Sequence, residues 1–581
     1  MQTILLAAVL GAALAADTVV VCPTPFLSAF NPWVQHRRAQ GHNIIIVPTS
    51  RDVTAVHDRI RQVAQDGRVR TIVLIGDAPP ITERFDNEKP DDKPLDVREP
   101  RTVPTHYVPA KINVSWGSEP EIATDNPYAD FDGDRLPDAA IGRLTADTPD
   151  ELSVIVQKII DYENCRNFGP WRRRLNFVAG VGGFGAMADK AIEVGVKALI
   201  TRGVPTPYAT TMTYGSWRSP YCPDPKDFHG HLVDRLNEGC LYWVYIGHGH
   251  VRQLDRLRVP GGEHHIFDLH DVTKLACREE LPIAFFMACY TGAFDASADC
   301  LAEEMLRHPG APVAVIAGSR VTMPYGMAVL GMELLDAHFQ DQRTTSEAMT
   351  LGDVFLRAKR RMAGNGVAGN GVNNEYRPAL DEYRPAIDLL ANVLSPVKSD
   401  LAGERLEHLQ LFNLLGDPLL RIARPRRLEV RSASSVRAGE LLEIDGQCLV
   451  NGRSPVNGLA TIELTIRRDR LRFRPPIRST YSSASDATAQ YDDVYRQAND
   501  SCYVRVQTTV RDGRFEAMLK VPPDAWGECQ VRVFVEGSDE FAMGSAEVEV
   551  VRPEAVASTK EPSGVETARR AVTTTKSVSP R

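Results

Sequence analysis

The chain has 581 residues, 43% of them hydrophobic and 24% charged, so it is long enough to form several domains with buried cores. Its formal charge of -8 at pH 7 is small for this length, and no run of lysine and arginine stands out, which excludes nucleic acid as the main expected partner. Beyond the first residues, no segment offers the roughly 20 uninterrupted apolar residues of a stable membrane span.

The N-terminal stretch MQTILLAAVLGAALAAD joins an apolar run to the small-x-small pattern of a signal peptidase site. It predicts a signal peptide over residues 1–15 and export to the periplasm, the cell surface or the medium. Because the stretch lacks lysine and arginine at its start, a buried first strand or an uncleaved anchor stays open as the alternative. Ten cysteines are too few for a disulfide scaffold, although an exported protein can form a few bridges.

Next along the chain, buried-looking apolar runs alternate with amphipathic ones. The expected strands of this part are residues 18–22, 43–48, 71–77 and 139–144. The expected helices are residues 53–65 and 150–162. The same alternation continues with strands at residues 174–180, 240–247, 281–288 and 312–318, and helices at 188–202 and 271–277. This order predicts a three-layer α/β fold with a mostly parallel sheet, which the break near residues 164–174 divides into two halves.

After residue 422 the pattern changes to short alternating strands, which predicts a β-sandwich. Within it, the polar insert at residues 478–501 is expected to form an exposed loop. The predicted domains are a signal peptide (1–15), an N-terminal α/β subdomain (16–165), a catalytic α/β subdomain (166–425), the β-sandwich (426–552) and a disordered tail (553–581).

Two of the predicted strands end in reactive residues, since residues 240–247 run into His248 and residues 281–288 run into Cys289. Functional groups gather at the carboxyl ends of parallel strands, so both side chains are expected in one cleft. An adjacent imidazole favours the thiolate that attacks a substrate. The amides of Gly249 and Cys289 are the candidate donors to a developing oxyanion. A packed, unreactive cysteine is the alternative, because free cysteines are often buried.

These motifs resemble a known family. The segments YIGHGH, FFMACYTGAFD and GDPLL look like those of the gingipain-type cysteine peptidases, family C25 of the caspase-like clan. The resemblance implies a caspase-like fold followed by an immunoglobulin-like domain. It also implies that His248 is the general acid and base, that Cys289 is the nucleophile, and that protein or peptide substrates are cleaved through a thioester without a catalytic cofactor.

The sequence departs from the family pattern at Val181, where gingipains carry an acidic residue that orients the histidine. Either a Cys-His dyad suffices, or Asp255 or Glu263 reaches the imidazole, or activity is weakened. By the resemblance, Asp189 lies near the position that holds a basic P1 side chain, and an aspartate suits an arginine physically. An aspartate at a helix start is also a common cap.

The segment DNPYADFDGDRLPD crowds Asp130, Asp132, Asp134 and Asp138 around a glycine turn. Alternating carboxylates of this kind wrap a hard cation, so we expect structural calcium there. Gingipain-like enzymes bind structural calcium, which agrees with this expectation. The distal glutamate of an EF-hand is missing, and a solvated acidic turn is the alternative.

Two other functions stay open. The first is a zinc-dependent hydrolase, because histidines are common zinc ligands and several lie close together in the sequence. These are His248, His250, His264, His265 and His270. The second is an exported binding or adhesion protein on an inactive peptidase scaffold, which Val181 favours and the intact His-Gly and Ala-Cys pairs oppose.

Overall fold

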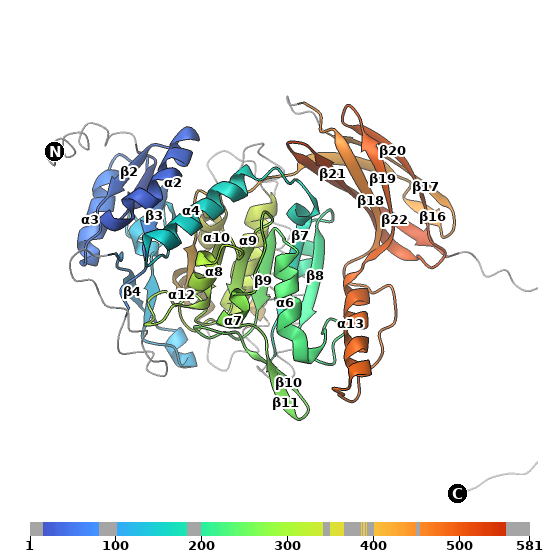
Figure 1. Cartoon of the computed structure of the whole chain (residues 1–581), viewed down its shortest axis with the longest axis horizontal. Coiled ribbons are helices and arrows are strands. Elements are labelled where there is room, and N and C mark those ends of the chain that lie inside the picture. Colours follow the sequence, from blue (N-terminus) through green and yellow to red (C-terminus); the bar gives the residue numbers. More distant parts are fainter. Residues whose placement is uncertain are drawn as a thin grey trace, which may run out of the picture.

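The computed structural model describes residues 16–80, 101–182, 199–340, 349–364, 385, 387–389, 391, 400–448 and 454–552. The predicted signal peptide, the predicted tail, the substrate-binding candidate Asp189 and most of the predicted helix at 188–202 lie outside these residues. Figure 1 shows an α/β part followed along the chain by an all-β part. Within the described ranges, no helix has both the length and the apolar character needed to cross a membrane.

A ten-stranded sheet forms the centre of the α/β part, which confirms the predicted mostly parallel sheet. Its strands, in spatial order, are β2 (Ile44–Val47), β1 (Thr18–Val21), β3 (Thr71–Ile75), β6 (Ala140–Leu144), β14 (Phe412–Leu415), β13 (Ala314–Gly318), β12 (Ile283–Met287), β9 (Tyr242–Ile246), β7 (Arg174–Ala179) and β8 (Ala209–Tyr214). Every neighbouring pair is parallel except β14 with β13. The early strands and the later strands therefore share one sheet, joined through β14.

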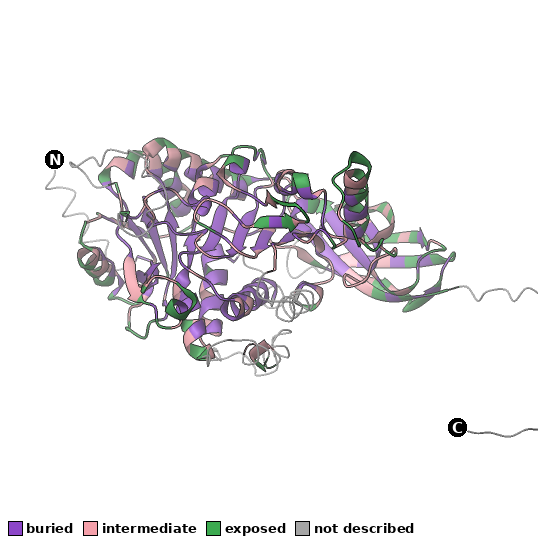
Figure 2. Cartoon of the chain, turned by 90° about the horizontal axis from the view of Figure 1, so that it is seen from below, coloured by how far each residue is buried: buried purple, intermediate pink, exposed green. Residues whose placement is uncertain are grey.

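The central strands are buried on both faces, which explains their nearly continuous apolar sequences. Every residue of strands β1, β3, β12 and β13 is buried. Val20 packs in the same core as α2 (Leu27–Ala39), whereas Val19 and Val21 pack with α3 (Val53–Ala64) on the opposite face. Figure 2 shows this buried centre between helices whose outer faces are exposed.

The other helices cover the two faces of the sheet in the arrangement of Figure 1. In front lie α4 (Pro149–Asn164), α6 (Phe228–Asn237), α7 (Leu269–Val272) and α8 (Leu301–Arg307). Behind lie α9 (Pro324–Gln340), α10 (Leu351–Met362) and α12 (Leu401–Leu411). Local capping fixes several helix starts, as at α4, where Thr148 just before the helix and Glu151 in its first turn form a capping box.

Two short hairpins and several helical turns complete the α/β part. The hairpins are β4 (His106–Pro109) with β5 (Glu121–Thr124) and β10 (Arg256–Val259) with β11 (Gly262–His265). The turns are η2 (Thr24–Phe26), η3 (Asn113–Trp116), η4 (Asn126–Ala129), η5 (Pro170–Arg173), η6 (Leu199–Gly203) and η7 (Pro225–Asp227). The hairpin β10–β11 projects from the sheet next to α7 (Figure 1).

The all-β part confirms the change of pattern predicted after residue 422. Its strands are β15 (Arg426–Ser432), β16 (Ser435–Arg437), β17 (Leu441–Cys448), β18 (Gly458–Ile466), β19 (Cys502–Val510), β20 (Arg514–Lys520), β21 (Gly527–Gly537) and β22 (Phe541–Val551). They follow the order β19-β18-β21-β22-β15-β17-β20, with β16 beside β22. Their alternating inward residues form a separate hydrophobic core. The immunoglobulin-like character of this domain stays a prediction.

The polar insert at residues 478–501 is not a loop, so that prediction is wrong. Helix α13 (Ser485–Asn499) forms there and buries one face against the edge strand β8. The side-chain amide of Asn499 donates to the Met212 carbonyl at 3.0 Å, and its oxygen accepts from the Met212 amide at 2.7 Å. The helix therefore covers the open edge of the ten-stranded sheet.

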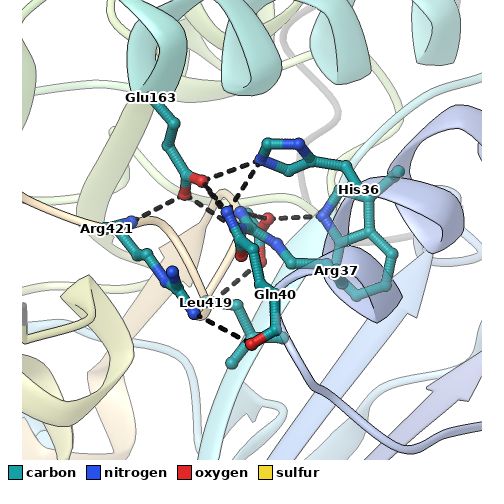
Figure 3. Close-up of polar contacts among 8 residues, drawn as sticks. His36, Arg37, Gln40, Glu163, Leu419 and Arg421 are labelled. Carbon is teal, nitrogen blue, oxygen red and sulfur yellow. Dashed lines mark hydrogen bonds and ion pairs between the residues drawn. The ribbon is translucent and has the colours of Figure 1, made fainter.

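A buried polar network ties the first helix to the end of the α/β part (Figure 3). Glu163, at the end of α4, accepts hydrogen bonds from Arg37 at 2.7 and 2.8 Å and from the Arg421 amide at 2.8 Å. Asp417 accepts from Arg37 at 2.5 Å and from the Leu419 amide at 2.8 Å, so it caps the turn that follows β14. Burial opposes the charge on Glu163, yet Arg37 and the surrounding donors hold the pKa of Glu163 below its usual value.

All ten cysteines lie in the described ranges, and each is a free thiol. Eight of them are buried, whereas Cys289 and Cys502 are partly exposed. Cys289 is therefore not one more fully packed cysteine.

Candidate active site

The two strands that carry the predicted reactive residues are neighbours. β9 and β12 pair in parallel, with Ile246 opposite Met287 at their carboxyl ends. His248 follows one of these ends and Cys289 follows the other, and both side chains are partly exposed. The structure thus brings the two residues to the same edge of the sheet, as the spacing of the apolar runs predicted.

Gly249 brings the two loops into direct contact. A Cβ atom at this position would lie 2.7 Å from the Cys289 carbonyl oxygen and 2.9 Å from the Ala288 Cβ, so only glycine fits. Gly249 forms an isolated bridge with Leu254, and its hydrogen bonds run through the flanking residues: the His250 amide donates to Gln253 and the Asp255 amide to His248. The Gly249 amide itself takes no part in this bridge.

Tyr245 holds the loop that carries His248 through a hydrogen bond, a role that no sequence motif indicated. Its hydroxyl donates to the His248 carbonyl at 2.8 Å, and the ring is fully buried. Gly180 and Gly247 make room for this hydroxyl, because a Cβ on either would lie within 2.7 Å of it. Burial raises the pKa of the Tyr245 hydroxyl, as do the charges of Asp255 and Cys289, so it stays a neutral donor.

Thr322 makes close polar contacts with the sulfur of Cys289. Its backbone amide donates to Cys289 Sγ at 3.3 Å, and its hydroxyl oxygen lies 3.6 Å from the same atom. Thr322 follows β13, the strand beside β12. An N–H donor in this position can stabilise a negative charge on the sulfur. The sequence feature that could have indicated Thr322 is its position shortly after the predicted strand at residues 312–318, a third neighbouring strand.

Helix α12 holds the loop that carries Thr322. The Met323 amide donates to Nε2 of the buried His408 at 2.8 Å, while Nδ1 of His408 pairs with the Glu404 carbonyl at 2.8 Å. The Gly326 amide donates to the Glu404 carboxylate at 3.0 Å. Burial raises the pKa of Glu404 to about 7 and lowers the pKa of His408 to about 4.

A buried ion pair locks the cysteine loop to the next loop. Arg320 is fully buried and makes a bidentate contact with Asp295, at 2.8 and 2.6 Å. The Tyr290 amide donates to the Arg320 carbonyl at 3.2 Å. Tyr290 has a φ of 57°, a left-handed conformation that is uncommon for a residue other than glycine. The residue after Cys289 is therefore held in a costly backbone conformation by its surroundings.

The family is decided by comparison with known proteins. Residues 12–423 match the sequence model of Peptidase family C25, which is well over half of the chain. The chain belongs to Peptidase family C25. This is a family of cysteine-type endopeptidases, as the resemblance of the sequence motifs indicated.

Relatives of the C25 chain include two gingipains of Porphyromonas gingivalis. The chain is 25% identical over 270 residues to Gingipain R2 of strain ATCC 33277, which covers 44% of this chain and 33% of the relative. It is 25% identical over 270 residues to Gingipain R1, which again covers 44% of this chain but 24% of the relative. The match thus spans a third or less of the length of these relatives.

The solved structures that resemble the chain over most of its length include two proteases. One is the Arg-specific cysteine proteinase gingipain R, with a TM-score of 0.49 and 17% identity over 93% of this chain and 98% of the other. The second is described as a protease, with a TM-score of 0.49 and 14% identity over 92% of this chain and 97% of the other.

The two carboxylates that the sequence offers in place of an acid at Val181 differ in their placement. Val181 packs against the hydrophobic core. Asp255 starts beside the histidine, because its amide donates to the His248 carbonyl at 3.3 Å. Glu263 instead pairs with Arg256 across the β10–β11 hairpin at 2.9 Å.

Three of the four predicted calcium ligands converge. Oxygen atoms of Asp130, Asp132 and Asp138 lie within 4.8 Å of one another, and Asp134 is not in this group. The loop's own donors already contact these oxygens. The Gly133 and Arg135 amides donate to Asp130, the Asp134 amide to Asp132, and the Phe131 amide and Arg360 guanidinium to Asp138.

The carboxylates of this loop can hold a hard cation as well as these donors, because each oxygen has two lone pairs. Burial raises the pKa of Asp130, and the Asp132 and Asp134 carboxylates raise it further, while the Gly133 and Arg135 amides oppose this. A cation would relieve that repulsion, so the residues fit calcium.

The histidines of the zinc hypothesis do not gather as one group in the described part of the chain. Of His248, His250, His264, His265 and His270, only His265 joins a set of close potential metal ligands, and its partners there are His229 and Asp271.

Proposed function

We propose that the protein is a cysteine endopeptidase in which Cys289 is the nucleophile and His248 is the general acid and base. One observation carries this proposal: the loops that follow β9 and β12 touch through Gly249, at a distance that admits no side chain. Such an arrangement keeps an imidazole and a thiol at one edge of the sheet. Membership of family C25 supports the same chemistry.

In the proposed reaction, the His248 imidazole takes the proton of the Cys289 thiol, and the sulfur attacks the carbonyl carbon of the peptide bond. The amides of Gly249 and Cys289 donate to the oxyanion that forms. As the C–N bond breaks, the imidazolium gives its proton to the leaving amine, and a thioester stays on Cys289. Water, deprotonated by His248, then hydrolyses the thioester and restores the thiol.

The Thr322 amide favours the first of these steps. Its hydrogen bond to Sγ supplies a partial positive charge where the sulfur becomes anionic. Tyr245 has the complementary role on the other loop, because its bond to the His248 carbonyl limits how far the imidazole can move away from the thiol. With Val181 in place of a carboxylate, these backbone contacts carry the positioning of the dyad.

We further propose cleavage after basic P1 residues, with Asp189 as the partner of the basic side chain. The motif resemblance and the charge complementarity of a carboxylate and a guanidinium support this preference. Incubation with a mixed peptide library should give products that end in arginine or lysine, and Asp189→Asn should shift that preference.

We propose structural calcium at Asp130, Asp132 and Asp138, on the strength of their converging oxygens. We also propose export through the N-terminal signal sequence. Export would be measured as loss of residues 1–15 from the secreted protein by N-terminal sequencing.

The decisive experiment labels the full chain with a thiol-directed peptidyl affinity probe. We expect one probe per chain on Cys289, with no labelling of Cys289→Ala. The matched control is Cys502→Ala, because Cys502 is the other partly exposed cysteine and lies in the all-β part. Labelling that persists in Cys289→Ala and disappears in Cys502→Ala would refute the proposed nucleophile.

A binding protein on an inactive scaffold is the second candidate, and Val181 is the observation that favours it. This candidate predicts a folded protein that retains peptide ligands but neither cleaves them nor reacts with the probe. Val181→Glu should leave its inactivity unchanged, whereas in a weakened peptidase it should raise kcat.

A further inference from the structure

A second group of potential ligands lies outside the proposed active site, at the foot of the β10–β11 hairpin. It consists of His229 on α6, His265 at the end of β11 and Asp271 on α7, whose ligand atoms all lie within 4.8 Å of one another. Asp271 is fully buried, while the histidines are partly exposed. Three separate elements therefore place nitrogen and oxygen ligand atoms close together, at a position that solvent can reach.

The distances within this group match a metal site. His229 Nδ1 is 3.0 Å from one Asp271 oxygen, and His265 Nε2 is 3.3 Å from the other. Zinc–ligand bonds of about 2.0–2.1 Å in a tetrahedron place neighbouring ligand atoms about 3.3 Å apart. The two imidazole rings are stacked, with centroids 4.1 Å apart and planes at 28°. Both rings thus offer a nitrogen to the same carboxylate.

An ordinary ion-pair cluster is the competing explanation. Lys274 Nζ lies 2.8 Å from Asp271, and the Asp268 amide donates to the same carboxylate at 3.2 Å. The stacked imidazoles oppose a cluster in which both rings are charged, because two protonated rings at such a distance repel each other. Neutral imidazoles are the form that binds transition metals. Lys274 is 38% exposed, so its ammonium can move into water when a cation takes its place.

The far nitrogen of His229 also has a carboxylate nearby. His229 Nε2 lies 3.8 Å from the exposed carboxylate of Asp227, slightly beyond hydrogen-bond distance. Metal-binding histidines commonly direct their second nitrogen at a carboxylate, which fixes the ring and its tautomer.

We propose that His229 Nδ1, His265 Nε2 and one oxygen of Asp271 bind a divalent transition-metal ion of the zinc type. Water completes the tetrahedral coordination. This site goes beyond the proposed peptidase activity and does not depend on it. Two histidines and one carboxylate are borderline ligands that suit zinc better than calcium, which prefers oxygen alone.

A bound metal ion would hold α6, α7 and the β10–β11 hairpin together, because each of these elements supplies one ligand. From His265, the backbone contact continues through the Ile266 amide, which donates to the Asp255 carbonyl at 3.2 Å. The Asp255 amide in turn donates to the His248 carbonyl at 3.3 Å. The ion would therefore stiffen the hairpin base that adjoins the His248 loop.

The test uses the full chain with Cys289→Ala and Cys502→Ala, so that neither partly exposed thiol can bind the metal. Titration with Zn²⁺, and with Co²⁺ followed by its visible absorption, should show one tight tetrahedral site and a rise in melting temperature. His229→Ala and His265→Ala should each weaken binding about 100-fold or more. His264→Ala is the matched control, because this neighbour on the hairpin lies outside the ligand group and should leave binding unchanged.

Lys274→Met separates the metal site from the ion-pair cluster. It removes the competing ammonium, so Zn²⁺ should bind more tightly than in the parent, and the melting temperature with Zn²⁺ should rise at least as far. If the parent binds no Zn²⁺, or if binding survives the joint replacement of His229 and His265, the proposal is wrong. Since Cys289 is absent throughout, neither result bears on the proposed peptidase reaction.

Discussion

The backbone amide of Thr322 points at the sulfur of Cys289, 3.3 Å away, and this loop is anchored in turn by the buried His408. Two consecutive backbone amides therefore make different contacts. The Thr322 amide donates to the Cys289 sulfur, and the Met323 amide donates to the His408 imidazole on α12. The position of the donor at the sulfur therefore depends on a residue of helix α12, His408, which lies 85 residues after Met323 in the chain.

Replacing His408 should slow the reaction of Cys289 with an alkylating reagent at fixed pH. His408→Leu leaves the buried Met323 amide without an acceptor, at a cost of about 1–3 kcal/mol, and releases the loop. His408→Gln offers an oxygen to the same amide and should restore part of the rate. Equal rates in the parent and His408→Leu would show that the helix does not position this loop.

The stability of the protein should fall as the solution is acidified. Burial lowers the pKa of His408 to about 4, below its value of about 6.5 in an unfolded chain, so the unfolded state binds more protons between these values. The contribution is complete above about pH 6.5 and is lost as the pH falls toward 4. It amounts to about 2 kcal/mol between pH 6.5 and pH 5. Denaturant unfolding should show this loss, with a shallower pH dependence in His408→Gln.

Tyr245→Phe should reduce kcat about tenfold while KM and the melting temperature change little. The ring and its packing stay, and only the hydrogen bond to the His248 carbonyl is removed, which corresponds to about 1.4 kcal/mol of lost positioning. Steady-state kinetics on a peptide substrate measures the split. A rise in KM at constant kcat would point to a role in substrate binding instead.

Arg37→Met should destabilise the fold by about 3–5 kcal/mol, because it leaves the buried carboxylates of Glu163 and Asp417 without their shared cation (Figure 3). Arg38→Met is the matched control, since Arg38 is the next residue on the same helix and is exposed. It should change the free energy of unfolding by less than about 0.5 kcal/mol. Similar effects of both substitutions in urea unfolding would mean that the network contributes little.

Calcium should raise the melting temperature, by an amount that corresponds to about 2.7 kcal/mol at a hundredfold excess over its dissociation constant. Asp132→Asn should remove most of this response, although its side-chain oxygen can still accept from the Asp134 amide. Asp134→Asn, outside the converging group, should retain it. No response in the parent, after treatment with a chelator and addition of Ca²⁺, would exclude the site.

The parts of the fold that could be predicted are the buried strands, because a continuous run of apolar residues indicates burial. The strands that end at His248 and Cys289 are continuous apolar runs, and their order along the chain suffices to make them neighbours. β8 was missed, because ATTMTY is an edge strand with a partly polar sequence. Thr322 was missed because no motif marks it, and its role follows only from which strands are adjacent.

The sequence of helix α13 contains a helical pattern of apolar residues, but its polar composition led to the prediction of a loop. Its polar residues suggested a loop, yet its buried residues Tyr491, Val494, Tyr495 and Ala498 recur at helical spacing. The face they form has a partner only when strand β8 lies beside it. Composition alone therefore misleads where a largely polar helix packs through one narrow stripe.

The arrangement of β14 has a consequence for how the chain acquires its fold during synthesis. This strand comes last in the sheet by sequence, but it lies between β6 and β13 and is the seam that unites the early and late strands. A nascent chain that has not yet emerged past residue 415 can assemble two partial sheets but cannot merge them. Ribosome-bound intermediates should accordingly stay open to proteases along that seam until the final central strand arrives.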